Sequence, residues 1–384
     1  MHVFFRRIHL YLGLAAGLVI LIACLTGAVL VFEKDLQQAT SPHRYFVKAQ
    51  GVRQPLAVLA DAVRDSFPAG TLTGVKVYTD PGRTVEVTIA FPKAPVAKKA
   101  TSAERAPAFT IFVNPYTAEV LQKYSYRETA FYKVFALHRW LLGTDKGPGK
   151  MIVGIATLIF LFILLTGIIL WWPKTRAILS GRLRVKWAGG WKRLTHDLHI
   201  VLGFYSSIFL FVIAFTGLPW SFEWFNNGIY KVTGSPLKAP PPPPSAYQAG
   251  VPPITPDRAL ETASTVYPRA VFFSISIPKD STDPLLVSAL PERAVHESAT
   301  DAVYLDRYTG AVLQTLRYSE RSAGARARST FKPVHTGSIW GLPSKVVAFV
   351  VCLLGASFPV TGTIMWLNRK RKKKKAGQSL RRDL

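Results

Sequence analysis

The sequence predicts an α-helical integral membrane protein with four transmembrane helices and two extracytoplasmic α+β domains. Two observations lead to this fold class. Four stretches of the 384-residue chain are almost free of charge and come close to the ~20 apolar residues that cross a hydrocarbon core: residues 10–32, 151–172, 200–222 and 346–367. Long segments follow the first and third of these stretches, and they contain both helical and strand patterns.

The first apolar stretch is expected to be an uncleaved signal anchor. Arg6 and Arg7 precede it, as the basic start of a secretory signal would. However, the stretch is too long for the apolar part of such a signal, and the following "VFEKDLQQ" contains no small-residue cleavage site.

The net charge of +26 is explained by membrane topology. Basic runs follow the second and fourth stretches, "PKTRAILSGRLRVKWAGGWKR" and "NRKRKKKKAGQSLRRDL". Because Lys and Arg accumulate on the cytoplasmic side, we expect a multi-pass protein of the bacterial inner membrane with both termini in the cytoplasm. The runs fit contact with the lipid bilayer, and we expect no nucleic-acid binding.

This topology divides the chain into consecutive parts. They are transmembrane helix 1 (1–34), a first extracytoplasmic domain (35–130), an interfacial segment with transmembrane helix 2 (131–173), a basic cytoplasmic loop (174–195), transmembrane helix 3 (196–224), a second extracytoplasmic domain with a polyproline linker (225–330), an interfacial segment with transmembrane helix 4 (331–368) and a basic cytoplasmic tail (369–384).

The two halves of the chain repeat each other, which predicts an internal duplication. "NPYTAEVLQ" (114–122) matches "DRYTGAVLQ" (306–314), and "LLTGIILWW" (164–172) matches "FPVTGTIMW" (358–366), each about 190 residues apart. Each half crosses the membrane twice, so both halves enter it in the same direction. We therefore expect a pseudo-two-fold axis along the membrane normal.

Each extracytoplasmic domain is expected to be one helix followed by a small antiparallel sheet. "QPLAVLADAVRDSFP" and "TPDRALETASTVYP" place a proline at the first helical turn and an aromatic-Pro pair at the end. Alternating segments such as "TVEVTIAF" and "VFFSISIP" predict the strands, with "YTAEVL" and "YTGAVL" as hairpin turns. Ala118 replaces Gly310 in the first of these turns, which leaves its geometry open.

Four histidines form two pairs under this symmetry. His9 and His199 begin the first and third apolar stretches, while His138 and His335 precede the second and fourth on the opposite side. Two imidazoles from opposite sides are the axial ligands that a b-type haem needs. We therefore predict that these four residues bind the iron of two haem b groups, one near each membrane surface. The remaining unmatched histidines are expected at the protein surface: His2, His43 and His296.

Other polar groups near the predicted sites have several interpretations. His196 aligns with Arg6, which makes it a flanking residue, a partner for a haem propionate or a substitute ligand. Arg7, Arg139 and Arg193 are further candidates for propionate pairing, although topology explains Arg7 and Arg193 equally well.

Thr-Gly pairs in the helices support the two levels. From His9 to Thr26 a helix rises about 25 Å, which brings Thr26 close to His138 and His335, called here the outer pair; His9 and His199 are the inner pair. The pairs are Thr26-Gly27 and Thr216-Gly217 at the outer level, and Thr166-Gly167 and Thr361-Gly362 at the inner level. Such small residues give a flat porphyrin room between helices, or they simply let helices approach closely.

These motifs resemble a known family. The repeated "HxxxG…TG" helices, the "HTG" at His335 and the "YTGxV" turn are similar to the PepSY-associated transmembrane helix proteins, over essentially the whole chain. The resemblance implies PepSY-like extracytoplasmic domains and a link to iron and siderophore uptake. It also implies the activity of a haem-containing ferric-siderophore reductase.

The expected function is therefore a transmembrane oxidoreductase that reduces a ferric siderophore or another ferric chelate in the periplasm. Iron with two histidine ligands has no open position, so we expect outer-sphere electron transfer. No GxGxxG motif or flavin domain is visible, so the electron donor is expected to be a quinol or a cytoplasmic flavoprotein. Lys93, Lys98 and Lys99 are candidates for attracting an anionic chelate.

Other classes of function remain open or are excluded. A regulatory or scaffold protein, whose PepSY-like domains bind or inhibit a periplasmic partner such as a protease, needs no cofactor. A transporter subunit fits less well, because the apolar stretches contain no acidic residue for ion coupling. Cys24 and Cys352 both lie in apolar stretches, which excludes a disulfide framework and a c-type haem motif.

Overall fold

The computed structural model describes residues 2–92, 108–173 and 175–380 and divides into two compact units. The first, here called the membrane unit, contains residues 1–32, 130–229 and 331–384. The second, the sheet unit, contains residues 33–129 and 230–330. Lys93, Lys98 and Lys99 lie outside the described residues.

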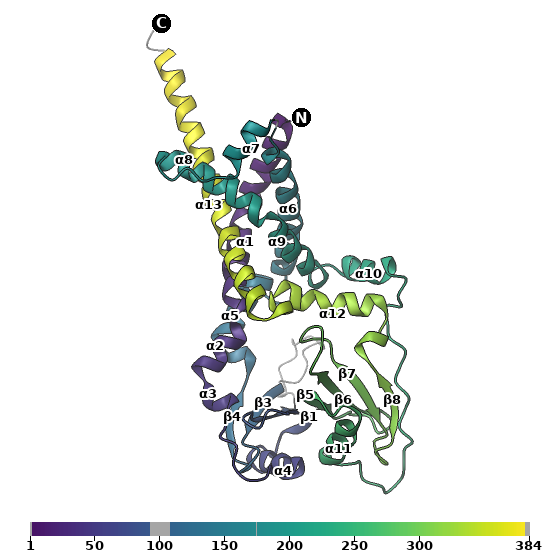
Figure 1. The fold of residues 1–384 in the computed structure, drawn as a ribbon. Coiled ribbons are helices and arrows are strands. Elements are labelled where there is room, and N and C mark those ends of the chain that lie inside the picture. Colours follow the sequence, from purple (N-terminus) through teal and green to yellow (C-terminus); the bar gives the residue numbers. More distant parts are fainter. Residues whose placement is uncertain (1, 93–107, 174, 381–384) are drawn as a thin grey trace, which may run out of the picture. The chain divides into compact units, whose positions relative to one another are not determined.

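The membrane unit is a bundle of helices (Figure 1). Its elements are α1 (His2–Val31), α5 (Ala130–Trp140), α6 (Pro148–Trp171), α7 (Arg176–Arg182), α8 (Gly190–Asp197), the π-helical turn η2 (Leu198–Leu202), α9 (Gly203–Gly217), the 3-10 turns η3 (Leu218–Trp220) and η5 (Ser338–Trp340), and α13 (Leu342–Leu380). Helices α1 and α9 each contact both α6 and α13, so these four form a closed bundle. Two further helices, α10 (Glu223–Val232) and α12 (Ala323–His335), contain a boundary between the units.

Four helical segments of the described chain are long and apolar enough to cross a membrane, as the sequence predicts. They are His2–Val31, Pro148–Trp171, Gly190–Trp220 and Leu342–Lys372. The bundle also exposes large apolar side chains, among them Leu18 (70%), Phe162 (61%) and Ile208 (62%). Lipid is the solvent that suits such a surface, so the chain is a membrane protein. The basic segment after residue 369 continues α13 as helix to Leu380.

The sheet unit contains eight strands in one antiparallel sheet with the order β4-β3-β2-β1-β5-β6-β7-β8. The strands are β1 (Thr71–Tyr78), β2 (Val85–Ala90), β3 (Ala108–Val113), β4 (Val120–Tyr124), β5 (Ala270–Ser276), β6 (Leu285–Pro291), β7 (Asp301–Leu305) and β8 (Val312–Leu316). The expectation of two separate small sheets is wrong, because β1 pairs with β5 and places Val75 opposite Ile275. Without this pairing, β1 and β5 would each be an edge strand with a row of unpaired backbone groups.

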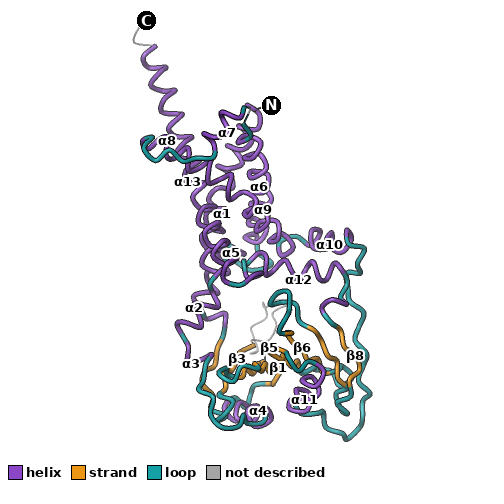
Figure 2. Tube along the Cα trace, viewed as in Figure 1, coloured by secondary structure: helices purple, strands orange, loops and turns teal. Residues whose placement is uncertain are grey.

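Two helices cover one face of this sheet, α4 (Leu56–Ser66) and α11 (Pro256–Val266) (Figure 2). Strand β2 alternates buried and half-buried residues, which places Val85, Val87 and Ile89 against the helices. Both helices begin beside the predicted prolines and end before an aromatic residue, as expected. The smaller helical elements are α2 (Glu33–Thr40), α3 (Pro42–Tyr45), η1 (Tyr126–Glu128) and η4 (Tyr318–Glu320).

The two hairpin turns share one backbone conformation. Gly310 has a φ of 75°, and Ala118 at the matching position has a φ of 59°. The left-handed region costs a residue with a Cβ about 1–2 kcal/mol, so the first turn keeps its shape at some strain. In the second turn the Asp306 carboxylate is buried, which opposes its ionisation. Hydrogen bonds from the backbone N–H groups of Thr309, Tyr308 and Ala246 nevertheless hold the pKa of Asp306 below its usual value.

His296, which we expected at the surface, is only 6% exposed. Its Nδ1 atom accepts a hydrogen bond from the backbone N–H of Ser298, and its Nε2 atom lies 3.0 Å from the Tyr318 hydroxyl. Burial lowers the pKa of this imidazole. The ring therefore links the segment around Ser298 to Tyr318. A search for positions repeated in the two halves cannot reveal this role.

Candidate functional site

The structure brings His9 and His199 together inside the membrane unit. Their ring centres lie 6.4 Å apart, and the ring planes are nearly perpendicular, at 81°. His9 comes from α1, and His199 comes from η2, the π-helical turn between α8 and α9. Such turns insert one extra residue into a helix and are frequent at functional sites.

His138 and His335 form the second pair. Their ring centres are 6.1 Å apart with an interplanar angle of 59°. They lie near the ends of α5 and α12, which are not membrane-spanning helices. Burial, and for His138 also the neighbouring His335, lowers the pKa of His138 to about 4; burial likewise lowers the pKa of His335. Both rings are therefore neutral at pH 7, the form that ligates a metal.

A hydrogen bond at Nδ1 orients each ring of the outer pair. His138 Nδ1 lies 3.0 Å from the carbonyl oxygen of Ala23, and His335 Nδ1 lies 2.8 Å from that of Ile213. A carbonyl oxygen only accepts, so Nδ1 carries the proton in both rings. The Nε2 atoms keep their lone pairs, and neither makes a hydrogen bond within the described chain.

Threonine hydroxyls orient the rings of the inner pair, His9 and His199, through hydrogen bonds at Nδ1. Thr166 Oγ1 lies 3.0 Å from His9 Nδ1, and Thr361 Oγ1 lies 2.8 Å from His199 Nδ1. Each threonine donates its own proton to a carbonyl one turn earlier in its helix, 2.9 Å away for Thr166 and 3.0 Å for Thr361. The hydroxyl oxygen therefore accepts from Nδ1–H, and again Nε2 is left as the basic nitrogen. This is the arrangement that holds metal-ligating histidines in place.

The glycine after each threonine makes room for an imidazole. A Cβ atom on Gly167 would lie 3.3 Å from Cε1 of His9, and one on Gly362 would lie 3.4 Å from Cε1 of His199. At the outer pair, Gly27 and Gly217 would approach His138 and His335 to 3.3 and 3.0 Å. The four Thr-Gly pairs thus lie at the predicted levels. The atoms next to each glycine are those of a histidine ring, so the small residues give room to the imidazoles.

The backbone beyond His138 is strained. Leu141 and Leu142 both adopt left-handed φ angles, 51° and 66°, and a Cβ on Gly149 would collide with the carbonyl group of Trp140. This tight connection joins α5 to α6 directly after the histidine. Two residues in the left-handed region cost of order 1–2 kcal/mol each, which the packing of the site has to offset.

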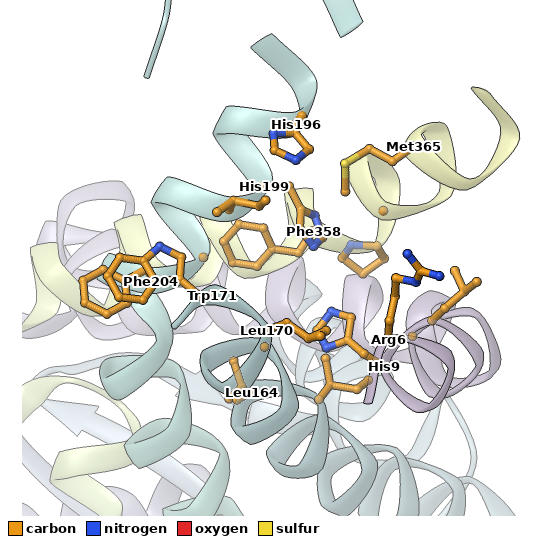
Figure 3. A pocket seen from close by; sticks show the side chains of 18 of the residues that line it. Arg6, His9, Leu164, Leu170, Trp171, His196, His199, Phe204, Phe358 and Met365 are labelled. Atoms are coloured by element: carbon orange, nitrogen blue, oxygen red, sulfur yellow. The ribbon is translucent and has the colours of Figure 1, made fainter. Parts of the chain in front are cut away.

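A cavity of about 690 Å³ adjoins the inner pair (Figure 3). Its volume lies within the ~300–1,000 Å³ typical of cofactor and ligand sites. His9 and His199 line it together with apolar side chains that include Leu164, Phe204 and Phe358. The indole ring of Trp171 stacks on Phe204 with ring centres 3.6 Å apart and forms one wall.

Polar groups of the cavity wall suit an anionic group on a largely apolar ligand. Arg6, Arg182, Lys192 and Arg369 line the cavity. The Nε1–H group of Trp171 is buried and has no hydrogen-bond partner among the described residues, so it can donate to a ligand.

The arginines that the sequence suggested as propionate partners lie differently. Arg7 and Arg193 do not line the cavity, and Arg193 forms an ion pair with Asp197 at 2.8 Å. Arg139 donates to the backbone oxygen of Trp220. His196 does line the cavity, with its Nδ1 atom 3.2 Å from Asp197.

These features fit haem better than a bare metal ion. The ring centres of the two pairs lie 6.4 and 6.1 Å apart, a separation at which two imidazoles could share one metal through bonds of ~2 Å. Two nitrogens do not complete the coordination of a metal ion, and a porphyrin supplies the missing ones. His9 with His199, and His138 with His335, are the residues that would hold such a group.

Sequence reasoning missed two parts of this site. The first is Trp171, which is only 6% exposed. The spacing of an isolated tryptophan does not distinguish a place at the membrane surface from a place in a cavity wall. The π-helical turn at His199 also has no signature in the sequence.

Fold and site together define a class: a four-helix membrane protein that contains two pairs of oriented histidines and carries a second unit built on an antiparallel sheet. Within that class the chain belongs to the PepSY-associated TM region family, whose sequence pattern matches residues 6–369. The resemblance expected from the histidine and Thr-Gly motifs is thereby confirmed. No curated protein matches the chain.

Proposed function

We propose that this protein is a haem-containing transmembrane oxidoreductase that passes electrons across the bacterial inner membrane to a ferric chelate, such as a ferric siderophore, in the periplasm. The observation that carries the proposal is the state of the four histidines. Each is fixed through Nδ1 and keeps a free Nε2, and each has a partner ring about 6 Å away. Haem b bound at the two pairs supplies one-electron transfer.

The chain's own groups have simple roles in this proposal. Thr166 and Thr361 orient the inner rings, and the carbonyls of Ala23 and Ile213 orient the outer ones. Arg6 and the Trp171 indole would hold propionates of the inner group. Apolar side chains such as Leu164 and Phe358 would contact the face of the inner group.

Reduction at the periplasmic side takes one electron per Fe(III) and yields Fe(II), whose bonds to hard oxygen donors are weaker. The iron then leaves a siderophore more easily, which links the activity to iron uptake. No side chain has to form a bond with the chelate, because electron transfer to it is outer-sphere. A quinol or a cytoplasmic flavoprotein would donate the electrons on the inner side.

The mirrored strand order of the sheet, with one helix and four strands on each side of the junction between β1 and β5, supports a duplication with two PepSY-like domains. The basic segment in α13 after residue 369 supports a cytoplasmic C-terminus. The repeat gives the two haem levels, and the position of the basic segment gives their order across the membrane.

Visible spectra of the detergent-purified protein test the proposal. We expect sharp reduced bands of low-spin haem b and a pyridine haemochrome count near two per chain. His199→Ala and His335→Ala should each remove about one haem, because each pair loses a ligand. His43→Ala changes an exposed histidine and should leave the count unchanged.

Two outcomes would contradict the proposal. An unchanged haem count in both ligand variants would overturn the ligand assignment. A colourless protein from haem-replete cells would instead favour a scaffold protein that binds a periplasmic partner.

A further inference from the structure

A cluster of cations and aromatic rings lies on the face of the sheet that α4 and α11 leave free. In β1, Lys76 and Tyr78 alternate with the buried Val75 and Val77, so their side chains point to the opposite face. Phe272 is the register partner of Tyr78 in β5 and adds a second ring. We call Lys76, Arg83, Tyr78, Phe272 and Phe46 the basic-aromatic cluster.

The cations of this cluster lie over the rings. Lys76 Nζ is 4.3 Å from the centre of Phe272 and 4.6 Å from that of Tyr78. Arg83 Cζ is 4.2 Å from Tyr78 and 5.0 Å from Phe46. These cation–π contacts stabilise the positions of the cations but satisfy none of their hydrogen-bond donors.

The two cations form no ion pair within the described residues, although Glu86 lies directly opposite Lys76 in the strand register. Lys76 Nζ and the Arg83 guanidinium make no hydrogen bond and no ion pair there, and Arg83 Nε is buried as well. The adjacent carboxylate, Glu86, instead accepts the hydroxyl proton of Tyr78 at 2.8 Å. Burial lowers the pKa of Lys76, and the positive charges of Lys34 and Arg83 add to this, although the carboxylates of Glu86 and Glu297 oppose it. Unpaired, half-buried donors are costly to a fold, which points to a ligand that satisfies them.

The other half of the sheet is built without such groups. In the register of the strand pairs, Lys76 lies opposite Glu86, and Ser276 lies opposite Leu286 at the matching place. Ser276 therefore takes the position of Lys76, and Pro278, two residues further on, that of Tyr78. The strand pairing is equally regular on both sides. The sheet therefore does not require the cluster. Because the cluster is present in only one of the two halves, we interpret it as a binding site.

We propose that the basic-aromatic cluster binds an anionic ferric chelate whose iron is held by catecholate rings. A ferric tris-catecholate is a trianion, so its charge complements Lys76 and Arg83, and its rings can stack on Phe46 and Phe272. A neutral hydroxamate chelate matches neither feature. This inference rests on the proposed function for the fate of the iron, but not for binding itself.

Isothermal titration of the full chain with the gallium(III) complex of a hexadentate tris-catecholate tests the inference. Gallium(III) is not reduced, so the heat reports binding alone. Lys76→Ser and Arg83→Gln should each weaken binding by about tenfold or more, since a hydrogen bond to a charged group contributes ~1.5–3 kcal/mol. Lys123→Ser is the matched control, because Lys123 also lies over rings, 4.1 Å from Phe109, but on an exposed part of β4.

The outcomes separate this inference from the proposed function. Equal affinity of wild type and both cluster variants, or no binding by the wild type, overturns the inference while the haem count stands. Binding that is lost in the cluster variants of a haem-free protein supports the inference and contradicts the proposed function. Unchanged melting of the variants shows that they fold.

Short-chain phosphatidylglycerol serves as the competing anion, because it has a negative charge but no ring. Displacement of the gallium complex only at far higher lipid concentration supports recognition of the catecholate. Displacement at equal concentration would mean that the cluster binds charge alone, and would overturn the catecholate assignment.

Discussion

Each imidazole of the two pairs is oriented through one nitrogen, Nδ1. The rings of His9 and His199 donate to threonine hydroxyls, and that of His335 donates to a backbone carbonyl. His138 Nδ1 lies 3.0 Å from both the Ala23 carbonyl oxygen and the Thr26 hydroxyl. A hydroxyl rotates and can accept or donate, but a carbonyl oxygen only accepts. The backbone carbonyls therefore set the tautomer of His138 and His335, and no single side-chain substitution removes them.

Gly217 is the residue whose substitution should act most directly on the outer pair. A Cβ atom there would lie 3.0 Å from Cε1 of His335, so Gly217→Val should push the ring out of line. We expect the pyridine haemochrome count to fall from about two to about one per chain. Gly228→Val is the control, because a Cβ on Gly228 meets nothing within 4 Å. A normal count in the Gly217 variant would show that the ring does not serve as a ligand.

At this scale the sequence predicted which histidines meet, because the repeat and the rise of a helix determine their levels. It did not predict what the glycines accommodate. Gly27 and Gly217 face imidazole rings, and a pattern of small residues does not say which group fills the space beside them. The left-handed conformation of Leu141 and Leu142 was also unpredictable, since leucine has no preference for it.

Among the elements, α4 depends on its neighbour for its N-terminal hydrogen bonds. Its N-cap is Pro55, which has no side-chain acceptor, and the Asp257 carboxylate of α11 accepts from the backbone N–H groups of Leu56 and Ala57 at 2.6 and 2.8 Å. Helix α11 is capped by its own Thr255. Helix α11 therefore helps to fix the N-terminus of α4.

Asp257→Ala should destabilise the sheet unit by about 1–2 kcal/mol, the usual cost of losing a helix cap. For a unit of this size that corresponds to a fall in Tm of about 2–8 °C. Differential scanning calorimetry of the detergent-solubilised protein measures it. Asp61→Ala removes a carboxylate that is exposed on α4 and that, among the described residues, pairs with Arg64, so its effect should be small. Identical shifts in the two variants would contradict the capping role.

Helices and strands followed from apolar periodicity and from proline and glycine signals, and α4, α11 and the strand segments lie where these signals predict. The pairing of β1 with β5 could not be predicted. It is made by backbone groups of two edge strands, and the side chains of Val75 and Ile275 would look the same at a free edge.

For the whole molecule, the proposed function requires both histidine pairs at once. Proteoliposomes that contain the protein, with a ferric chelate inside and a membrane-impermeant reductant outside, should accumulate Fe(II) inside. His199→Ala and His335→Ala should each abolish this, because either loss interrupts the path. Wild-type rates in either variant would mean that electrons cross without that pair, and empty liposomes measure leakage.

The four membrane helices were predictable from composition alone, because the bilayer requires long apolar segments. The cavity beside the inner pair was not, since it depends on how side chains from α1, α6, α9 and α13 fit together. Arg6 and Lys192 line it, whereas their sequence neighbours Arg7 and Arg193 do not. The direction in which each side chain leaves its helix decides whether it reaches the cavity. The π-helical turn at Leu198–Leu202 changes these directions between α8 and α9.

The pairing of β1 with β5 also sets an order of events during synthesis. Strand β1 is complete at Tyr78, but its partner is complete only when Ser276 has been made. At ~5–20 residues per second the ribosome needs roughly 10–40 s for the intervening chain. Throughout that interval β1 presents an open edge, which invites pairing with another chain. A nascent protein of this kind therefore needs a chaperone or rapid insertion of its third membrane helix. A chain that terminates before β5 would keep the unpaired edge of β1 permanently.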